Sequence, residues 1–519
     1  MLANLPEGLH LTDYLIYRTA ASQQHRVAIR YRQTELTYGA LAESVSACGA
    51  WVRSLGFRPG QRAVLLLADC PSFVTAFFGI LAAGGIAVPV SPSLSVEDAA
   101  AAVSLAGASL VLVDRAQSRL AALKTLRDVS NLFLASAEDP SEFELSVDAF
   151  MGAPASLQHS PSDVAYGLLS SGSTGTPKII PHKHVDPVVG FALYAAPVLK
   201  IGSDDITLSV AKLHFGYGLG SNLFFPLCAG ASSVLISSPP SAHTVAAETT
   251  FHRPSLFFAQ PRALSEISSY GAGAQAFRQV RACVSAGEPL HASIIRGWLD
   301  FCDGEILDSY GTTEVGHVFL APRIGESKLG SVGKPISGCE TEIRTPEGEC
   351  SEPGTVGELW VRAPSAATGY WNDPAASSAI FQKGWVRTKD LFHKDKEGFY
   401  FLHGRVDDML KLGCGIWVNP VEMEAIINGI EGVVESAVVG AASDDGLTSL
   451  KAYIVLRDGT APHTLLSDIA DQIRQKWPQE AERQLTLAEF VRHLPRTATG
   501  KLDRRGLGGM TMTEFAYKC

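Results

Sequence analysis

Segments with strand-like and helix-like hydrophobic patterns alternate over the first third of the chain. Apolar runs of strand length occupy residues 62–67, 86–90 and 110–113, and apolar residues recur at helical spacing over 72–83 and 96–106. This order is βαβαβ, which indicates a parallel sheet with helices on its faces. We therefore expect a wound α/β sheet in the first part of the chain.

The alternation resumes after a polar stretch at 135–163. Strand patterns cover 206–210, 234–236, 256–258 and 282–285, and a helical pattern covers 292–301, so a second wound sheet is expected. Beyond residue 357, the segments GELWVRAPSAATGYW and GFYFLHGR are strand patterns broken by Gly and Pro. Such segments are typical of antiparallel strands, and we expect a small barrel-like sheet there.

A smaller unit follows from residue 405 onward. It shows strand patterns at 435–439 and 450–456 and an amphipathic helical pattern at 465–477. The expected fold class is α/β: a large N-terminal domain of two wound αβ sheets plus the barrel-like sheet, then a small α+β C-terminal domain. We place the boundary at 404–408, which gives domains of 1–404 and 405–519.

Composition and charge exclude several classes of protein. The 519 residues are 46% hydrophobic and 18% charged, with a net charge of −10, so no basic surface for nucleic acid is expected. No stretch reaches about 18 uninterrupted apolar residues, so we expect no membrane partner and a cytoplasmic location. Nine cysteines are scattered without a CxxC pair, as expected for reduced core thiols.

Residues 166–182, YGLLSSGSTGTPKIIPH, have a composition that suits phosphate binding. A hydrophobic strand leads into a loop of glycines and hydroxyl residues, and a second strand follows the lysine. Glycines expose backbone N–H groups in tight turns, and the spacing differs from that of a Walker A loop. Alone, such a stretch is more often a mobile surface loop than a phosphate site. The candidate phosphate ligands are Ser170, Ser171, Gly172, Ser173, Thr174, Gly175 and Lys178.

The segment DSYGTTE at 308–314 follows a strand and combines groups that can hold a nucleotide. Tyr310 supplies a ring, Gly311 a tight turn, Thr312 and Thr313 hydroxyls, and Glu314 a carboxylate. A carboxylate beside phosphates is suited to hold Mg²⁺, because magnesium prefers oxygen ligands. A capped helix start is the alternative interpretation.

Seven motifs occur in a fixed order along the chain: SSGSTGTPK, SAGEPL, DSYGTTE, GYW, TKD, GRVDD and PRTATGK. Together they resemble the adenylate-forming superfamily of acyl- and aryl-CoA ligases, adenylation domains and firefly-type luciferases, and the resemblance covers nearly the entire chain. It implies an active site between the large domain and a mobile C-terminal domain. It also implies ATP, Mg²⁺ and coenzyme A as cofactor and cosubstrates.

The resemblance assigns a role to individual positions. Lys501, Glu314 and Thr313 correspond to catalytic residues, with Glu314 holding magnesium. Asp407 corresponds to the hinge, and Lys411 to a residue of the thioester step. Besides the glycine-loop residues given above, the implied ATP- and AMP-binding residues are Gly287, Glu288, Pro289, Asp308, Tyr310, Gly311, Thr312, Asp390 and Arg405.

The segment KLHFGYGLG at 212–220 occupies the acyl-pocket region of the family. Its rings and glycines suit a flat acid: Phe215 and Tyr217 can line a ring, and Gly216 leaves room for a substituent. His317, one helical turn after Glu314, is expected to face this pocket or to be a structural histidine. The pattern resembles benzoate-CoA ligases, with 2-aminobenzoate (anthranilate) slightly ahead of benzoate as the substrate.

Other interpretations stay open. A free-standing enzyme that loads a carrier-protein thiol, a medium-chain acyl-CoA ligase and an inactive nucleotide-binding module are the alternatives to an aryl-CoA ligase. The loop KLGCGIWVNP is one residue longer than is usual in the family, so Lys411 is equally compatible with a surface lysine. We expect a monomer or a homodimer that binds a small aromatic acid.

Overall fold

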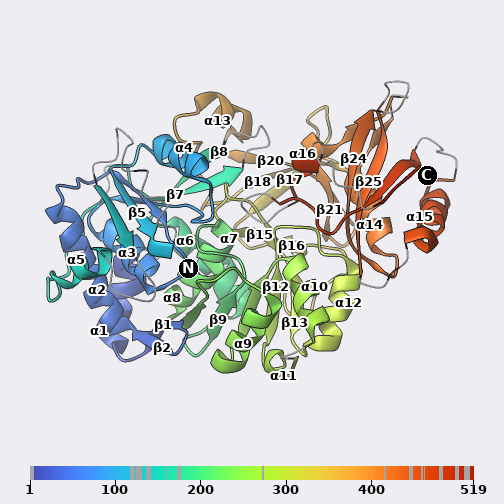
Figure 1. Ribbon diagram of the computed structural model, residues 1–519. Coiled ribbons are helices and arrows are strands. Elements are labelled where there is room, and N and C mark those ends of the chain that lie inside the picture. The colour runs from blue at the N-terminus through green and yellow to red at the C-terminus, as the bar shows by residue number, and fades with distance from the viewer. Residues whose placement is uncertain are drawn as a thin grey trace.

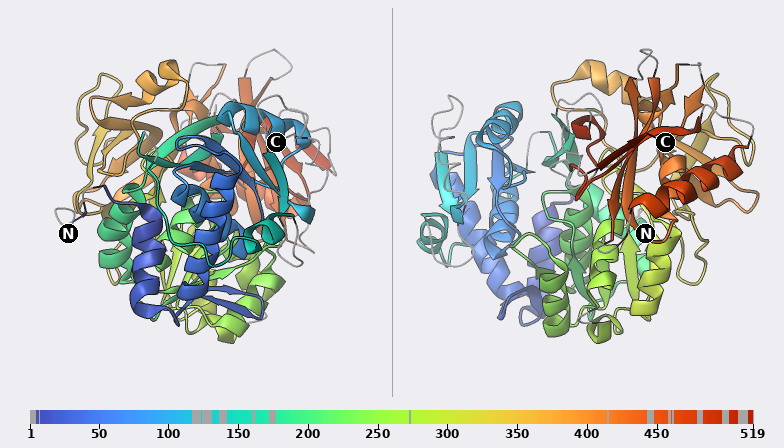
Figure 2. Two further views of the ribbon diagram at one scale, coloured as in Figure 1. Left: turned by 90° about the vertical axis from the view of Figure 1, so that its left-hand side faces the viewer. Right: turned by 45° about the vertical axis from the view of Figure 1, so that its right-hand side comes forward.

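The protein forms a large domain of three sheet layers and a smaller C-terminal domain, shown in orange and red in Figure 1. The computed structural model describes residues 5–6, 8–116, 123, 131–135, 142–159, 162–171, 177–271, 274–413, 416–442, 448–457, 460, 462–478, 483–496, 502–507 and 515–518. The C-terminal domain lies against one end of the large domain (Figure 1 and the right view of Figure 2).

The first wound sheet has six strands in the order β6-β5-β3-β4-β7-β8. All neighbours run parallel except β7 and β8, which form an antiparallel hairpin. The three strands expected from the first alternation are confirmed, but the hydrophobic pattern does not predict β6. The bounds are β3 Arg62–Leu66, β4 Ile86–Pro89, β5 Leu110–Asp114, β6 Asn131–Ala135, β7 Val164–Ser171 and β8 Pro177–Lys183.

Local sequence explains where the helices of this layer begin and end. Helix α3 begins at Pro71, whose fixed φ and missing N–H suit the first turn. Helix α4 begins after Ser95, whose hydroxyl accepts the N–H of Asp98 at 3.0 Å, and ends at Gly107 with φ 56°. The bounds are η2 Asp13–Tyr17, α1 Arg18–Gln23, α2 Tyr38–Ser54, α3 Pro71–Ala82, α4 Val96–Ala106 and α5 Glu142–Asp148.

The second wound sheet has seven strands in the order β13-β12-β11-β9-β10-β1-β2. Its strands are parallel except for the β1–β2 hairpin, and the predicted second sheet is confirmed. The strands are β1 Val27–Tyr31, β2 Thr34–Thr37, β9 Ile206–Ser209, β10 Ser232–Leu235, β11 Leu256–Ala259, β12 Ala282–Ser285 and β13 Glu305–Asp308. The helical segments around it are α6 Asp186–Gly190, η4 Phe191–Leu199, α7 Gly216–Leu219, η5 Gly220–Phe224, α8 Phe225–Ala229, α9 Ala242–His252, α10 Pro261–Tyr270, α11 Ala274–Phe277 and α12 Ala292–Phe301.

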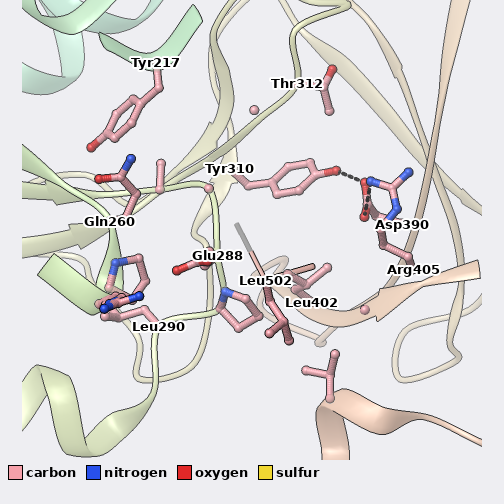
Figure 3. A pocket seen from close by; sticks show the side chains of 18 of the residues that line it. Tyr217, Gln260, Glu288, Leu290, Tyr310, Thr312, Asp390, Leu402, Arg405 and Leu502 are labelled. Atoms are coloured by element: carbon pink, nitrogen blue, oxygen red, sulfur yellow. Dashed lines mark hydrogen bonds and ion pairs between the residues drawn. The ribbon is translucent and has the colours of Figure 1, made fainter. Parts of the chain in front are cut away.

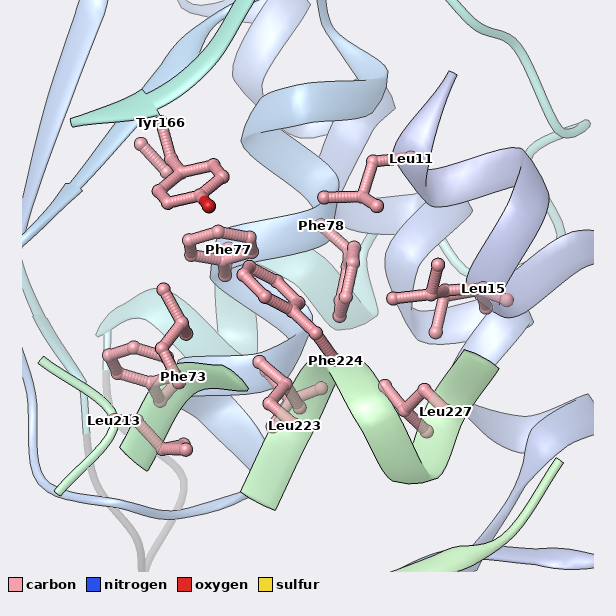
Figure 4. Close-up of a cluster of buried hydrophobic side chains, with 14 of the residues drawn as sticks. Leu11, Leu15, Phe73, Phe77, Phe78, Tyr166, Leu213, Leu223, Phe224 and Leu227 are labelled. Carbon is pink, nitrogen blue, oxygen red and sulfur yellow. The ribbon is translucent and has the colours of Figure 1, made fainter. Parts of the chain in front are cut away.

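One hydrophobic core joins the two wound sheets. It contains side chains of α3, of β7 and of the helical segments η5 and α8, and Figure 4 shows Phe73, Phe77 and Phe224 packed together with Leu213 nearby. Burial of so many apolar side chains is the main force that holds the two layers together. The carboxyl ends of strands from both sheets therefore face a common region.

The third layer is antiparallel, as predicted from its broken strand patterns. Strands β17, β18, β20 and β19 neighbour one another in that order, β21 pairs with β20, and β14, β15 and β16 form a separate small sheet. The bounds are β14 Tyr310–Gly311, β15 Val318–Ala321, β16 Lys334–Pro335, β17 Glu340–Arg344, β18 Gly357–Arg362, α13 Pro374–Ile380, β19 Phe381–Gln382, β20 Trp385–Lys394, β21 Tyr400–Arg405 and η6 Val406–Asp408.

The C-terminal domain is α+β, as expected. Its four-stranded sheet has the order β24-β25-β26-β27, and α14 and α15 pack on it around Met423, Ile427 and Ile469. The bounds are β22 Leu410–Lys411, β23 Trp417–Val418, α14 Pro420–Asn428, β24 Val433–Ala442, β25 Thr448–Leu456, α15 Pro462–Lys476, β26 Leu485–Phe490, α16 Arg504–Leu507 and β27 Phe515–Lys518.

Two sequence-based expectations about the whole chain can be compared with the described residues. None of their helices has both the length and the apolar character needed to cross a bilayer. The seven cysteines among them are free thiols, and Cys48, Cys70, Cys283 and Cys302 are buried as expected. Cys350 is exposed, so the expectation of core thiols is wrong at that position.

Candidate active site

A cavity of about 1110 Å³ lies where the large domain meets the C-terminal domain. Its walls combine the ends of wound-sheet strands, the turn after β14, strands β20 and β21, and residues of the C-terminal domain such as Arg496 and Leu502 (Figure 3). Predicted site residues from five of the seven motifs line this one cavity, although they are up to about 235 positions apart in the chain.

A hydrogen bond and an ion pair join Tyr310, Asp390 and Arg405 on one wall (Figure 3). The Tyr310 hydroxyl donates to Asp390, and Arg405 Nη1 lies 3.6 Å from Asp390 Oδ1 because β20 and β21 place the two residues opposite each other. Burial, with the Asp390 charge second, raises the pKa of Tyr310 well above its usual value. The phenol is therefore a neutral donor, and its ring is held in one orientation.

Thr312, Thr313 and Glu314 follow Tyr310 along the same wall. His182 Nε2 donates to the Thr313 carbonyl at 2.9 Å, and this contact fixes the backbone of the turn. The Tyr370 hydroxyl donates to Glu314 Oε1 at 2.8 Å. Thr312 Oγ1 is buried and has no hydrogen-bond partner among the described residues, which is costly unless a ligand supplies one.

The described residues of the predicted glycine loop, Ser170, Ser171 and Lys178, lie at the end of β7 and the start of β8. Ser170 pairs with Lys178 and Ser171 pairs with Pro177 across the hairpin, and both Ser170 and Lys178 line the cavity. Lys178 Nζ lies 4.9 Å from the centroid of the Tyr370 ring, which places its positive charge near Glu314. The predicted ligands Gly172, Ser173, Thr174 and Gly175 lie outside the described residues.

Gly287, Glu288 and Pro289 border the cavity on the side of the second wound sheet. Glu288 Oε1 accepts a hydrogen bond from Arg496 of the C-terminal domain at 3.1 Å, and Arg496 also pairs with Glu435. Glu288 therefore contributes to a contact between the two domains, a role that its motif did not predict.

Asp308 and Gly311 complete the set of predicted nucleotide residues in the cavity wall. Burial raises the pKa of the Asp308 carboxyl well above its usual range. A Cβ added at Gly311 would lie 2.2 Å from the His317 carbonyl oxygen, so only glycine fits at this crossing of the chain.

Phe215, Gly216, Tyr217 and His317 come together at one end of the cavity. The Tyr217 hydroxyl donates to the Val284 carbonyl at 2.8 Å, which fixes this ring. A Cβ added at Gly216 would contact Leu168 at 3.3 Å, so the position has little spare room on that side. The grouping agrees with an aromatic pocket, although the separate roles of these residues stay predictions.

His317 lies at this pocket, but it is not on the helix that the sequence pattern predicted. Residues 312–317 form turns and not a helix, and Gly316 has φ 91°, a conformation that interrupts a helix. The imidazole packs edge-on against Phe225 at 4.5 Å, and burial lowers its pKa to about 4. His317 Nε2 lies 3.4 Å from the Tyr217 carbonyl, which can only accept, so Nε2 carries the proton.

Of the predicted residues that the structure describes, Ser171, Asp407 and Lys411 are not among those that line the cavity. Asp407 pairs with Lys389 at 3.2 Å on the 3₁₀ turn η6, a position compatible with a hinge. Lys411 lies exposed on β22, 5.8 Å from the centroid of the Trp417 ring. Lys501 lies outside the described residues, as does Cys414, but Arg496 and Leu502 on either side of Lys501 line the cavity.

Sequence reasoning missed two residues of this site. Tyr370 belongs to the GYW motif and Arg496 to the PRTATGK motif, but the motifs alone predict no role for either residue. No short-range pattern connects Tyr370 to Glu314 or Arg496 to Glu288, because each pair is joined only by the tertiary fold.

Comparison with known proteins agrees with the motifs and the geometry. Residues 16–371 match the family described as AMP-binding enzyme, and residues 422–501 match the AMP-binding enzyme C-terminal domain. The chain is 34% identical to a benzoate–CoA ligase of Thauera aromatica over 512 residues, which cover 96% of both proteins.

Two solved structures superpose on nearly the whole chain. A benzoate CoA ligase from Burkholderia xenovorans LB400 matches with a TM-score of 0.88 and 32% identity over 96% of this chain and 99% of that one. The anthranilate CoA ligase AuaEII in complex with anthranoyl-AMP matches with a TM-score of 0.91 and 31% identity over 98% of both chains. The resemblance inferred from the motifs is confirmed, and the chain belongs to the AMP-binding enzyme family.

Proposed function

We propose that the chain is an ATP-dependent aryl-CoA ligase for a small aromatic acid of the benzoate or anthranilate type. In the first step a carboxylate oxygen attacks the α-phosphorus of ATP, which gives an aryl-AMP and releases pyrophosphate. In the second step the CoA thiolate attacks the acyl carbon and AMP leaves. The observation that carries this proposal is the single cavity that joins the Tyr310–Asp390–Arg405 wall to a pocket lined by aromatic rings.

The wall that contains Tyr310, Asp390 and Arg405, which we call the nucleotide wall, suits the first step. Two anions must approach each other in this step, so positive charge and fixed hydrogen-bond donors are needed at the reacting phosphate. Lys178 lines the cavity, and we propose that its positive charge faces the phosphates of ATP. We assign Lys501 a similar role, in which its positive charge offsets the negative charge of the reacting carboxylate. Asp390 accepts a hydrogen bond from the Tyr310 hydroxyl and lies near Arg405, and we propose that it binds the ribose hydroxyls of ATP.

Glu314 and Thr312 fit a magnesium ion bound together with ATP. Among the described residues no group of three His, Cys, Asp or Glu side chains could hold a metal, and Thr312, two positions before Glu314, has a buried hydroxyl without a partner. This small donor set is typical of Mg²⁺, which takes its other ligands from phosphates and water. When bound, the ion would neutralise phosphate charge.

The pocket around His317 favours anthranilate slightly over benzoate. Because Nε2 carries the proton, Nδ1 of the neutral imidazole is an acceptor, and it is buried without a partner among the described residues. An amino group ortho to the carboxylate can donate to such an acceptor, and benzoate cannot. The structural relative with anthranoyl-AMP bound agrees with a substrate of this size.

We also propose domain limits of 1–404 and 405–519, with Asp407 as the hinge and Lys411 in the thioester step. Gly404 has φ 118°, and Arg405 ends β21, so the chain leaves the large domain at this point. A cytoplasmic location, where ATP and CoA are abundant, and a monomer or homodimer complete the proposal.

A screen of acids for CoA thioester formation tests the proposed function. Benzoate, 2-aminobenzoate, 2-hydroxybenzoate, 4-hydroxybenzoate, cinnamate and octanoate would be compared by kcat/KM with ATP and CoA. We expect the small benzoates to lead, with 2-aminobenzoate first. A preference for octanoate would support the medium-chain alternative, and pyrophosphate release without any CoA thioester would support loading of a carrier protein.

A further inference from the structure

Asp69 is a buried carboxylate that the proposed reaction does not use. It lies between β3 and α3, at the carboxyl end of a central strand of the first wound sheet, and is 3% exposed. Burial raises its pKa to about 6, and the nearby positive charge of Lys212 opposes that rise. A buried carboxylate is costly to maintain, so its contacts indicate what it does.

Both oxygens of Asp69 accept the same backbone N–H. Leu213 N lies 3.1 Å from Oδ1 and 3.3 Å from Oδ2, across 144 positions of sequence. Leu213 follows β9 of the second wound sheet, so this contact connects the carboxyl ends of the two sheets. The Leu213 side chain is also fully buried, close to Phe73 of α3 (Figure 4).

Leu213 opens the segment that carries the aryl pocket. Phe215 N donates to the Lys212 carbonyl at 3.0 Å, and Leu219 N donates to the Phe215 carbonyl at 2.8 Å. A Cβ added at Gly218 would lie 2.2 Å from the Lys212 carbonyl oxygen, so the segment folds tightly back on its own start. Displacement of residues 212–213 therefore displaces Phe215, Gly216 and Tyr217 as well.

Lys212 anchors the same point from the opposite side. Its ammonium donates to the carbonyls of Ile236 and Ser238, which follow β10, with 2.8 Å to Ser238. The segment is thus fixed at one place by the ends of β3, β9 and β10. Such multiple support of a binding loop is the usual way in which a fold holds pocket residues in one geometry.

We propose that Asp69 is a positioning residue that sets the shape of the aryl pocket by holding the backbone of Leu213. This inference rests on the proposed aryl-CoA ligase function. Because Asp69 does not line the cavity, it acts through Phe215, Gly216 and Tyr217 and touches neither the acid nor ATP. Loss of the carboxylate loosens the pocket and leaves the nucleotide wall in place.

Three variants test this role by steady-state kinetics and by calorimetric binding of 2-aminobenzoate and ATP. For Asp69→Ala we expect the KM and Kd for the acid to rise roughly tenfold, because hydrogen bonds to charged groups contribute about that factor. The KM for ATP should stay within about twofold by the same reasoning. Asp69→Asn keeps one acceptor oxygen, so its effect should lie between those of wild type and alanine.

Asp205→Asn is the matched control. Asp205 lies at the other end of β9 and accepts hydrogen bonds from Gly202 N, Ser255 and Arg281, far from the pocket segment. It should lower the Tm without a selective change in acid binding. The preference for 2-aminobenzoate over cinnamate should also fall in Asp69→Ala and persist in Asp205→Asn.

The outcomes separate the inference from the proposed function. Suppose that the wild type is active and that Asp69→Ala leaves the KM values for acid and ATP unchanged, or changes both equally. That result would overturn the positioning role alone. A wild type that binds and activates no aryl acid would overturn both. If Asp69→Ala fails to fold, Asp69→Asn decides, and an acid affinity equal to that of the wild type, at full ATP affinity, would overturn the inference.

Discussion

At the scale of single residues, the hydroxyl of Tyr370 holds the Glu314 carboxylate in the cavity wall. Its hydroxyl donates to Glu314 Oε1 at 2.8 Å, and its ring lies beside Lys178. Tyr370→Phe keeps the ring and removes the donor, so we expect ATP–pyrophosphate exchange with the acid to slow roughly tenfold, the usual effect of losing a hydrogen bond to a charged group. Normal exchange in this variant would show that Glu314 needs no such support.

Tyr400→Phe is the control for this experiment. It deletes a hydroxyl that is bonded to Thr341 at 2.8 Å in the same antiparallel layer, but Tyr400 does not line the cavity. Its exchange rate should equal that of the wild type. The comparison separates the loss of one hydroxyl in this layer from loss of the contact with Glu314.

Buried histidines predict how stability depends on pH. Burial lowers the pKa of His10 to about 4 and that of His184 to about 3, both below the unfolded value of about 6.5. Between these values the unfolded chain binds more protons than the folded protein, so stability is retained above about pH 6.5 and falls as the pH drops below it. Each such histidine contributes a slope of up to about 1.4 kcal/mol per pH unit in this window.

Thermal unfolding between pH 7 and pH 5 measures this slope. We expect the Tm of the wild type to fall on acidification, and His184→Gln should show a smaller fall whatever its Tm at pH 7, because glutamine does not titrate. His25→Gln, at an exposed position, should show the same fall as the wild type. Equal pH dependence in all three proteins would exclude His184 as a source of acid sensitivity.

At the scale of elements, local signals account for what the sequence predicts well. Helix α4 was predictable at both ends because Ser95 caps it and Gly107 ends it, and the hairpin around the glycine loop follows from two apolar runs that flank small residues. Strand β6 lies next to a polar stretch that obscures it. The segment before His317 looks helical by spacing, but Gly316 and the pairing of β15 with β14 override that preference.

The helical segment η5 carries a further prediction about the aryl pocket. A Cβ added at Gly220 would lie 2.2 Å from His317 Cδ2 and 2.8 Å from Nε2. His317 is buried between η5 and the β14–β15 turn, so Gly220→Ala should displace the imidazole and raise the KM for 2-aminobenzoate roughly tenfold, as expected for one misplaced polar contact. ATP binding, measured by calorimetry, should not change.

Gly297→Ala provides the control for Gly220→Ala. Gly297 lies within α12, and a Cβ added there would have only one ordinary contact, at 3.8 Å from Ser268 Oγ. Alanine should therefore leave the kinetics unchanged and, by helix propensity, leave the Tm equal or slightly higher. Unchanged acid binding in Gly220→Ala would mean that the His317 ring does not contribute to the pocket.

At the scale of the whole molecule, the fold class and both domains were predictable because hydrophobic periodicity and the ordered motifs extend through the chain. Part of the cavity lining was also predictable, since Ser170, Tyr310 and Asp390 belong to those motifs. Contacts between distant elements, such as Asp69 with Leu213 and Arg496 with Glu288, were not predictable. Nothing in either local sequence encodes the partner, which only the packing of sheets and domains brings near.

Side-chain contacts hold the C-terminal domain in the orientation seen here, and two of them lie beside the cavity. Arg496 pairs with Glu288 at 3.1 Å, and Asn428 Nδ2 lies 3.2 Å from His291 Nε2 of the large domain. The Arg496 side chain is only 17% exposed, so its charge depends on Glu288 and Glu435 for compensation. If the domain turns between the two half-reactions, as the family resemblance implies, these contacts favour the orientation in which Arg496 and Leu502 border the cavity.

Arg496→Gln should therefore affect the two half-reactions differently. The variant loses the interdomain ion pair, so the orientation in which Arg496 and Leu502 border the cavity becomes less populated. Aryl-AMP formation should slow roughly tenfold, as expected for loss of one hydrogen bond between charged groups. Thioester formation from supplied aryl-AMP and CoA should stay within about twofold of wild type, since it does not use this contact. Arg474→Gln, which removes an exposed pair with Asp471 on α15, should change neither step. Equal loss of both half-reactions in Arg496→Gln would assign Arg496 to the general stability of the C-terminal domain, and that result would leave the orientation of the domains to the hinge that we propose at Asp407.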